Sequence, residues 1–135
     1  MKALYHPMLL TILFCMTASA SFSNTCQSTD AAMIDYETTG TGTPFVLLHS
    51  SMMSQEDMRA QIECFSNFYQ VIAIDAREQG RSSSSNTPIS YAIMAADVIG
   101  NLDDLDIEKT NFLGQEAFGP AKRGVIHDLG QRHFQ

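Results

Sequence analysis

The stretch Thr110–Gly119 carries the residues of this sequence with the clearest potential for chemistry. A short apolar run leads into Gly114, and Pro120 follows as an acceptable first residue of a helix. This order predicts a strand, a sharp turn and a helix, which would lift Glu116 above the end of a sheet beside free backbone N–H groups. The same geometry, spelled G-x-S-x-G, presents a serine nucleophile in other proteins. Here Glu116 stands at the serine position and Phe118 at that of the second glycine.

The remaining segments would position this turn. Continuous apolar runs at 45–48 and 71–74 are typical of strands buried on both faces of a parallel sheet. Residues 33–38 alternate roughly with period two, as in a strand exposed on one face. Ser54, with Asp57 in the capping-box position, and Ser90 are expected to cap two helices. The apolar stripes of these helices are Met58, Ile62 and Phe65 in the first, and Met94, Val98, Leu102 and Leu105 in the second.

Strands that alternate with helices predict an α/β fold, with a mostly parallel sheet, flanking helices and right-handed crossovers. The serine-rich segment Ser82–Asn86 indicates a flexible loop. Three acids, Asp103, Asp104 and Asp106, gather near the end of the second helix, and we interpret them as a solvated face. Neither a metal nor a cofactor is expected, since no Cys-x-x-Cys pair or His/Cys cluster occurs.

The first residues have the composition of a targeting segment. Lys2 precedes an apolar run at 8–16, and Ala18-Ser19-Ala20 resembles a cleavage site. The apolar run is shorter than the roughly 20 residues that span a bilayer. An uncleaved anchor or a buried helix is the alternative. We therefore expect a signal peptide at 1–20, export to the periplasm or the exterior, a loose tail at 21–32 and a partial domain at 33–135.

The chain is acidic, with a formal net charge of -7 from 8 basic and 15 acidic residues. Nucleic acids and anionic membranes attract Lys/Arg patches, so neither is an expected partner. Removal of residues 1–20 leaves Cys26 and Cys64. In an exported protein these two can form a disulfide or remain as thiols, and the sequence leaves both open.

Three stretches, in this order, resemble motifs of the α/β-hydrolase superfamily over roughly Asp35 to Gly119. Leu47–Ser51 resembles the L-L-H-G-x stretch after the third strand, and Ile74–Ser82 resembles the I-D-x-R-G-x-G-x-S stretch after the fourth. Leu113–Gly119 resembles the nucleophile elbow. The resemblance implies an incomplete α/β-hydrolase fold, of which the chain holds the N-terminal half.

Site residues follow from this resemblance. It implies that the backbone N–H groups of Ser51 and Ala117 form an oxyanion hole and that Glu116 occupies the nucleophile position. A small ester-like molecule would be the ligand. The positions that resemble structural motif residues are His49, Asp75, Gly80, Gly114 and Gly119.

Several positions depart from the family pattern. Ser50, Glu78 and Phe118 stand where the family has glycine, and Glu116 replaces the serine. The family's catalytic acid and histidine follow later strands. His127 lies 11 residues beyond Glu116, so an intervening helix would place it about 16 Å away, against the roughly 3 Å that a general base needs. His133 lies farther along the same helix.

Three functions remain open from the sequence. The first is a truncated α/β-hydrolase of esterase- or lipase-like ancestry that lacks independent catalysis, and we favour it. The second is an exported, non-catalytic module that binds a ligand or a partner. The third is an active ester hydrolase with Glu116 as a carboxylate nucleophile. An open sheet edge at Phe112–Gly114 would favour self-association in the first two.

Overall fold

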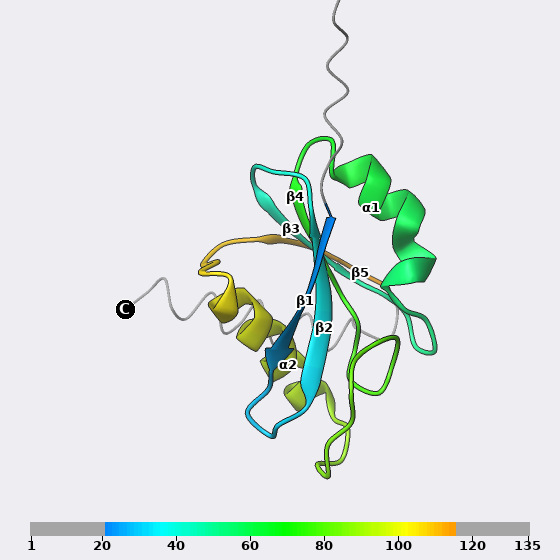
Figure 1. Cartoon of the computed structure of the whole chain (residues 1–135), viewed down its shortest axis with the longest axis vertical. Coiled ribbons are helices and arrows are strands. Elements are labelled where there is room, and N and C mark those ends of the chain that lie inside the picture. Colours follow the sequence, from blue (N-terminus) through cyan, green and yellow to red (C-terminus); the bar gives the residue numbers. More distant parts are fainter. Residues whose placement is uncertain (1–20, 116–135) are drawn as a thin grey trace, which may run out of the picture.

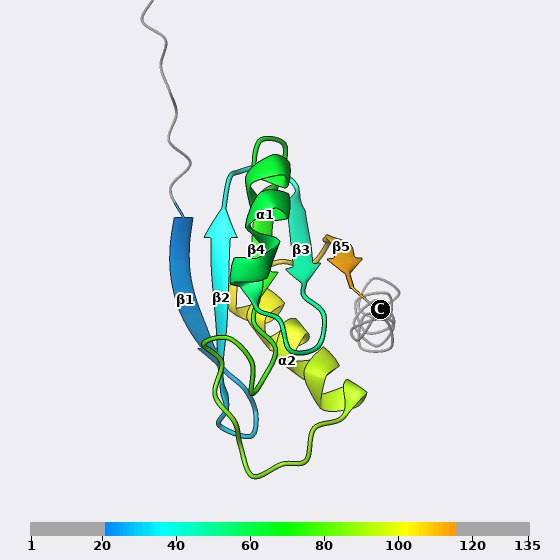
Figure 2. The same ribbon diagram turned by 90° about the vertical axis from the view of Figure 1, so that its right-hand side faces the viewer.

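The computed structural model describes residues 21–115, which form one sheet covered by helices on both faces (Figure 1). Helices α1 and α2 lie on opposite sides of the sheet (Figure 2). The strand order is β1-β2-β4-β3-β5. The elements are β1 (Ser21–Gln27), β2 (Met33–Thr39), β3 (Pro44–Leu48), the 3-10 helix η1 (Gln55–Met58), α1 (Arg59–Phe65), β4 (Gln70–Ile74), α2 (Tyr91–Asp104) and β5 (Asn111–Gly114).

Strands β3 and β4 form the buried centre of the sheet and are parallel, as their apolar runs predicted. Val46 and Leu48 face the core under α2, whereas Leu47 faces the core under α1. Successive side chains of a strand point to opposite faces, so strands covered on both faces must be apolar throughout. Strand β5 pairs with β3 in parallel on the other side.

Strands β1 and β2 extend the sheet in the antiparallel sense, so the sheet is mixed. The prediction of a loose segment at 21–32 is wrong over Ser21–Gln27, which forms β1. This strand is polar and mostly exposed on both faces, and it therefore shows no hydrophobic alternation that the sequence could reveal. Its order comes from backbone pairing with β2.

The polar side of β2 is buried, which contradicts the expectation of a strand exposed on one face. Asp35 and Glu37 are each only 5% exposed. Arg59 of α1 covers Glu37 and donates hydrogen bonds to both of its carboxylate oxygens, at 2.8 and 2.5 Å. This ion pair lowers the pKa of Glu37. The alternating polar residues indicated an exposed face, but carboxylates can be buried when a paired cation from another element covers them.

Both helical segments begin where the sequence predicted, although the first starts as the 3-10 helix η1 and continues as α1 from Arg59. The Ser54 N–H donates to the Asp57 carboxylate at 2.8 Å in the expected capping box, and Ser90 accepts the N–H of Ile93 at 3.3 Å. The apolar stripes of both helices pack in the core, with Phe65 and Leu105 at its margins. No helix among residues 21–115 has the length and apolar character needed to cross a bilayer.

The acids at the C-terminal end of α2, Asp103, Asp104 and Asp106, are exposed, as expected, and Asp104 also links two elements. Asp104 accepts a hydrogen bond from the Tyr36 hydroxyl at 3.1 Å, which links α2 to β2. Burial, with this carboxylate beside it, raises the pKa of Tyr36 to about 12. The structure also shows Cys26 and Cys64 as free thiols, Cys26 half-buried in β1 and Cys64 exposed on α1.

Glu78 occupies a backbone conformation that suits glycine, with φ of 63°. Because a Cβ atom is unfavourable there by about 1–2 kcal/mol, and glycine loses more entropy on folding, Glu78→Gly should stabilise the chain by about 0.5–1 kcal/mol. Urea unfolding followed by circular dichroism measures this change. Glu78→Ala removes the charge and keeps the Cβ, so it should give no comparable gain. Equal effects of the two variants would contradict the backbone explanation.

Candidate functional site

Three motif segments leave the sheet from the same edge. Leu48 lies opposite Ile74 of β4 and opposite Gly114 of β5, and all three strands end there. The Gln115 N–H donates to the Leu48 carbonyl at 3.0 Å, so the chain after β5 departs beside the segment that follows β3. Ligand sites of open α/β sheets lie outside the carboxyl ends of the strands. The predicted site residues Glu116, Ala117 and Gly119 lie outside the described residues.

His49 connects the segments that follow β3 and β4. The ring is fully buried, its Nε2 accepts the Ala76 N–H at 3.0 Å, and its Nδ1 lies 2.7 Å from the Ser50 carbonyl. A ring nitrogen that accepts an N–H carries no proton, so Nδ1 must be the protonated nitrogen that donates to Ser50. Asp75 Oδ1, 3.8 Å from Nε2, is therefore not the partner in an ion pair. Both ring nitrogens hold backbone groups.

Asp75 organises the segment after β4 from within the core. Its Oδ1 accepts the Gln55 N–H at 2.7 Å and its Oδ2 accepts the Arg81 N–H at 2.9 Å. Gly80 approaches the carboxylate so closely that a Cβ there would lie 2.2 Å from Oδ2. The aspartate and glycine of this motif are thus parts of one contact: the carboxylate fills the space that a side chain at Gly80 would need.

A buried polar network, which the sequence did not reveal, continues from Asp75. The Gln55 side chain donates to Asp35 at 2.6 Å, and Ser82 accepts the Asp35 N–H and donates to the Asp75 carbonyl, both at 2.8 Å. Burial and the nearby charge of Asp75 raise the pKa of Asp35. Ser83 also bonds to both backbone polar groups of Met33. The expectation of a flexible serine-rich loop is wrong for these first two serines, because they anchor the loop on β2.

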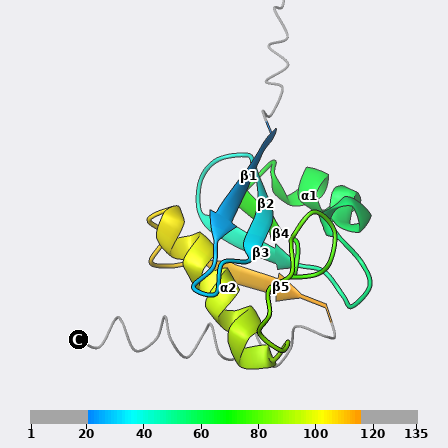
Figure 3. The same ribbon diagram turned by 60° about the horizontal axis from the view of Figure 1, so that its bottom comes forward.

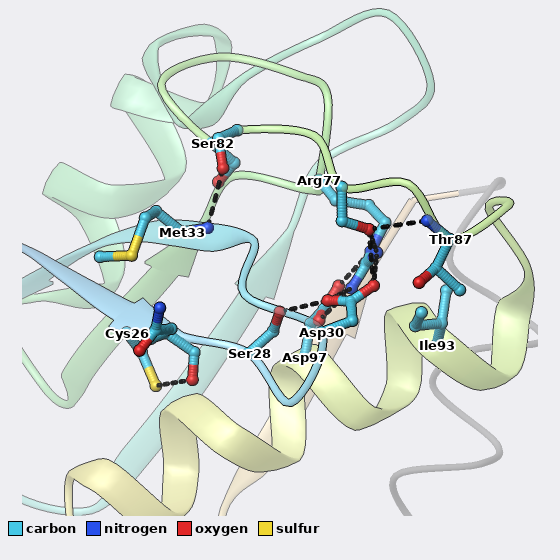
Figure 4. Close-up of polar contacts among 12 residues, drawn as sticks. Cys26, Ser28, Asp30, Met33, Arg77, Ser82, Thr87, Ile93 and Asp97 are labelled. Atoms are coloured by element: carbon cyan, nitrogen blue, oxygen red, sulfur yellow. Dashed lines mark hydrogen bonds and ion pairs between the residues drawn. The ribbon is translucent and has the colours of Figure 1, made fainter.

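Arg77 is the second centre that the sequence did not reveal (Figure 4). Its guanidinium is buried and donates to both Asp97 oxygens, at 2.7 and 2.6 Å, and to Asp30 at 3.0 Å. Ser28 and Ser85 also donate to Asp30, at 2.5 and 2.6 Å. Burial raises the pKa of Asp97, although the hydrogen bonds from Arg77 act against it. The cluster joins the β1–β2 turn, the serine-rich loop and α2.

This cluster makes stability depend on pH. Hydrogen bonds from Arg77, then from Ser28, lower the pKa of Asp30 well below its usual range. A carboxyl whose folded pKa lies below its unfolded value stabilises the fold above the unfolded pKa, near 3.9, and loses this contribution as pH falls further. Urea unfolding of the wild type should thus show stability falling below about pH 5, and Asp30→Asn should fall less steeply. Identical slopes would contradict a lowered pKa for Asp30 in the folded chain.

A cavity of about 490 Å³ opens at the same edge of the sheet. Ser51, whose N–H was predicted as an oxyanion donor, lines it, and that N–H donates to none of the described residues. The lining side chains that belong to the described part of the chain are uncharged. They come from the segments after β3 and β4 and from the start of α2: Ser51, Gln79, Ile89, Ser90, Tyr91 and Met94. Figure 3 shows the start of α2 and the chain that leads to it from β4.

The residues at this edge suit the recognition of a neutral molecule better than metal binding. Within 21–115, no three His, Cys, Asp or Glu side chains are placed to hold a metal ion. The cavity has the size of small-molecule pockets, which are usually about 300–1,000 Å³ and mostly apolar with a few polar groups. The edge therefore offers a backbone donor beside an apolar wall.

No family model matches the sequence. A protein of Mycobacterium phage D29 that is named as a non-heme haloperoxidase is 32% identical over 107 residues, which cover 77% of this chain and 36% of that protein. The epoxide hydrolase CorEH shares the fold at a TM-score of 0.77, with 26% identity, over 82% of this chain and 39% of CorEH. An N-acyl homoserine lactone degrading enzyme gives a TM-score of 0.75 and 30% identity, over 80% of this chain and 41% of that enzyme. The chain thus spans about two fifths or less of each of these relatives.

Proposed function

This chain belongs to the α/β-hydrolase superfamily, and from that premise we propose that it binds a small ester-like carbonyl compound without hydrolysing it independently. One observation carries the proposal: Ser51, whose N–H donates to no described residue, lines a cavity at the edge where β3, β4 and β5 end, and the described residues of the cavity wall are uncharged. A backbone N–H in this position is a donor for a carbonyl oxygen. A site of this kind is consistent with descent from an esterase-like protein.

We expect no hydrolysis because of the residue at the nucleophile position and because of the bonding of His49. The sequence places Glu116 where a serine would attack, and hydrolysis of a glutamyl ester would need a water activated by a base. His49 is the one histidine among residues 21–115, and both its ring nitrogens hold backbone groups. It has no nitrogen left to take a proton from water. The described part of the chain therefore supports recognition of a carbonyl group more strongly than its cleavage.

The test uses the full chain and 4-nitrophenyl butyrate. We expect no release of 4-nitrophenolate above the buffer rate, either from the wild type or from Glu116→Ser, because His49, the histidine among residues 21–115, cannot act as a base for the serine. NMR titration with methyl 4-phenylbutyrate should nevertheless shift the amide resonance of Ser51. Turnover by Glu116→Ser would contradict the missing-base argument, and an unshifted Ser51 resonance at saturating ester would contradict the site itself.

The second candidate is an active hydrolase with Glu116 as a carboxylate nucleophile, and trapping separates it from the first. Attack of the Glu116 carboxylate on the butyryl carbonyl would release 4-nitrophenolate and leave a mixed anhydride, which adds the mass of the butyryl group to the chain as long as it persists. Mass spectrometry after incubation with the nitrophenyl ester would detect that adduct. Because recognition without turnover needs no covalent step, we expect the mass of the chain to stay unchanged.

Export and self-association complete the proposal. Cleavage after Ala20 would leave β1 whole, because that strand begins at Ser21. The N-terminal residue of the protein recovered outside the cytoplasm would test this step.

Self-association would use the edge of β5, where Leu113 is 37% exposed and the described residues supply no outer neighbour. Sedimentation at several concentrations would detect it.

A further inference from the structure

Gln79 is the polar side chain of the cavity wall whose own bonding is incomplete. Its backbone is fixed, since its N–H donates to the Ala76 carbonyl and its carbonyl accepts the Ser82 N–H, both at 3.0 Å. The side-chain Oε1, by contrast, is buried and has no hydrogen-bond partner. The amide nitrogen also bonds to none of the described residues. A rigid turn thus holds Gln79 in the cavity wall, with its amide oxygen buried and its NH2 group without a partner among residues 21–115.

In this side-chain orientation the NH2 group of Gln79 is the part of the amide that a ligand in the cavity can meet, since the oxygen is buried. A buried donor or acceptor without a partner loses the hydrogen bond that water would supply. A ligand that offers an acceptor can pair with the NH2 group, and a site built to hydrogen-bond a ligand group discriminates strongly against analogues that lack that group. Rotation about the last side-chain bond can present either the amide oxygen or the NH2 group, so Gln79 can meet a carbonyl or an N–H.

The other lining side chains define the rest of the ligand. Ile89, Tyr91 and Met94 form an apolar wall, and among residues 21–115 none that lines the cavity carries a charge. Ile89 and Tyr91 are about half exposed, at 49% and 54%, so the wall can be reached from solvent. The chain as a whole is acidic, which disfavours anions near its surface. A ligand with an apolar group and a neutral polar end would fit the apolar wall and would not be repelled by the acidic chain.

We propose that Gln79 determines specificity in this cavity and selects an uncharged amphipathic ester or amide over the corresponding carboxylate anion. The inference rests on the proposed carbonyl-binding function and adds the residue that sets its preference. The ligand places its apolar part along Ile89, Tyr91 and Met94 and its polar end at Gln79. Since ester cleavage releases a carboxylate, the same preference would make the product of such a reaction leave.

The test compares methyl 4-phenylbutyrate with the 4-phenylbutyrate anion at pH 7 by NMR titration of the full chain. The ester should bind at least about tenfold more tightly, the factor that corresponds to 1.4 kcal/mol. Gln79→Leu should weaken ester binding by about tenfold, because the ligand's polar end would then lack its partner. Gln79→Glu should weaken binding of the anion more than binding of the ester.

Gln61 supplies a matched control. It also has a buried, unpartnered Oε1, but it lies on α1 and does not line the cavity. Gln61→Leu should leave ester affinity at the wild-type value. If Gln79→Leu binds the ester as Gln61→Leu does, or if the anion binds the wild type as tightly as the ester, the assignment to Gln79 is overturned while carbonyl binding stands. Absence of ester binding by the wild type would instead overturn the proposed function.

Discussion

Replacement of Arg77 by methionine should lower the free energy of unfolding by about 3–5 kcal/mol, the usual cost of removing one partner of a buried ion pair. The Arg77 side chain is 1% exposed, and it neutralises Asp97 and Asp30, whose side chains are 6% and 17% exposed. Methionine preserves much of the volume but leaves these carboxylates without their cation. A loss of this size is a large part of the 5–15 kcal/mol by which most domains are stable. Urea unfolding at pH 7 measures it.

Arg81 provides the control for Arg77. It pairs with Glu56 at 2.9 Å, and both side chains are 54% exposed. Exposed ion pairs contribute about 0–1 kcal/mol, so Arg81→Met should have little effect. In the double variant Arg77→Met, Asp97→Leu one unpaired carboxylate is also removed, and part of the stability should return. Equal losses for Arg77→Met and Arg81→Met would show that burial of the first pair has no energetic consequence.

Gly80→Ala should destabilise the chain by about 2–4 kcal/mol, because two independent penalties coincide there. The added Cβ would lie 2.2 Å from Asp75 Oδ2, and φ at Gly80 is +55°. The carboxylate cannot simply move away, since it holds the backbone N–H groups of Gln55 and Arg81. Displacing it would weaken the connection between η1 and the turn after β4. Thermal unfolding followed by circular dichroism would report the loss as a lower Tm.

Gly100→Ala is the same substitution in a permissive place. Gly100 lies within α2, and an added Cβ would meet nothing within 4 Å. Because alanine is favoured over glycine in a helix by about 1 kcal/mol, this variant should raise the Tm. The opposite signs of the two glycine variants are the expected outcome. Two shifts of the same sign would contradict the role assigned to Asp75.

The sequence predicts what depends on local pattern. The buried strands β3 and β4 and both helix starts were predicted correctly, because apolar runs and capping residues are properties of short segments. The motif resemblance also led to the correct fold. It placed Ser51, His49, Asp75 and Gly80 in the segments that follow β3 and β4.

The remaining features depend on partners far apart in the chain. Arg77 meets Asp97 20 residues later and Asp30 47 residues earlier, and no spacing rule connects them. The burial of Glu37 depends on Arg59, 22 residues away. Strand β1 has no apolar face and is ordered by its partner strand. Such pairings follow from the assembled sheet, so a reading of local periodicity cannot recover them.

The position of β4 within the sheet has a consequence for local opening. This strand is hydrogen-bonded on both sides, to β2 and to β3, and its side chains lie in both cores. Strand β1 is bonded on one side and covers little apolar surface. Amide protons of β4 should therefore exchange with deuterium only when the whole domain opens, whereas those of β1 exchange through fraying that leaves the cavity intact.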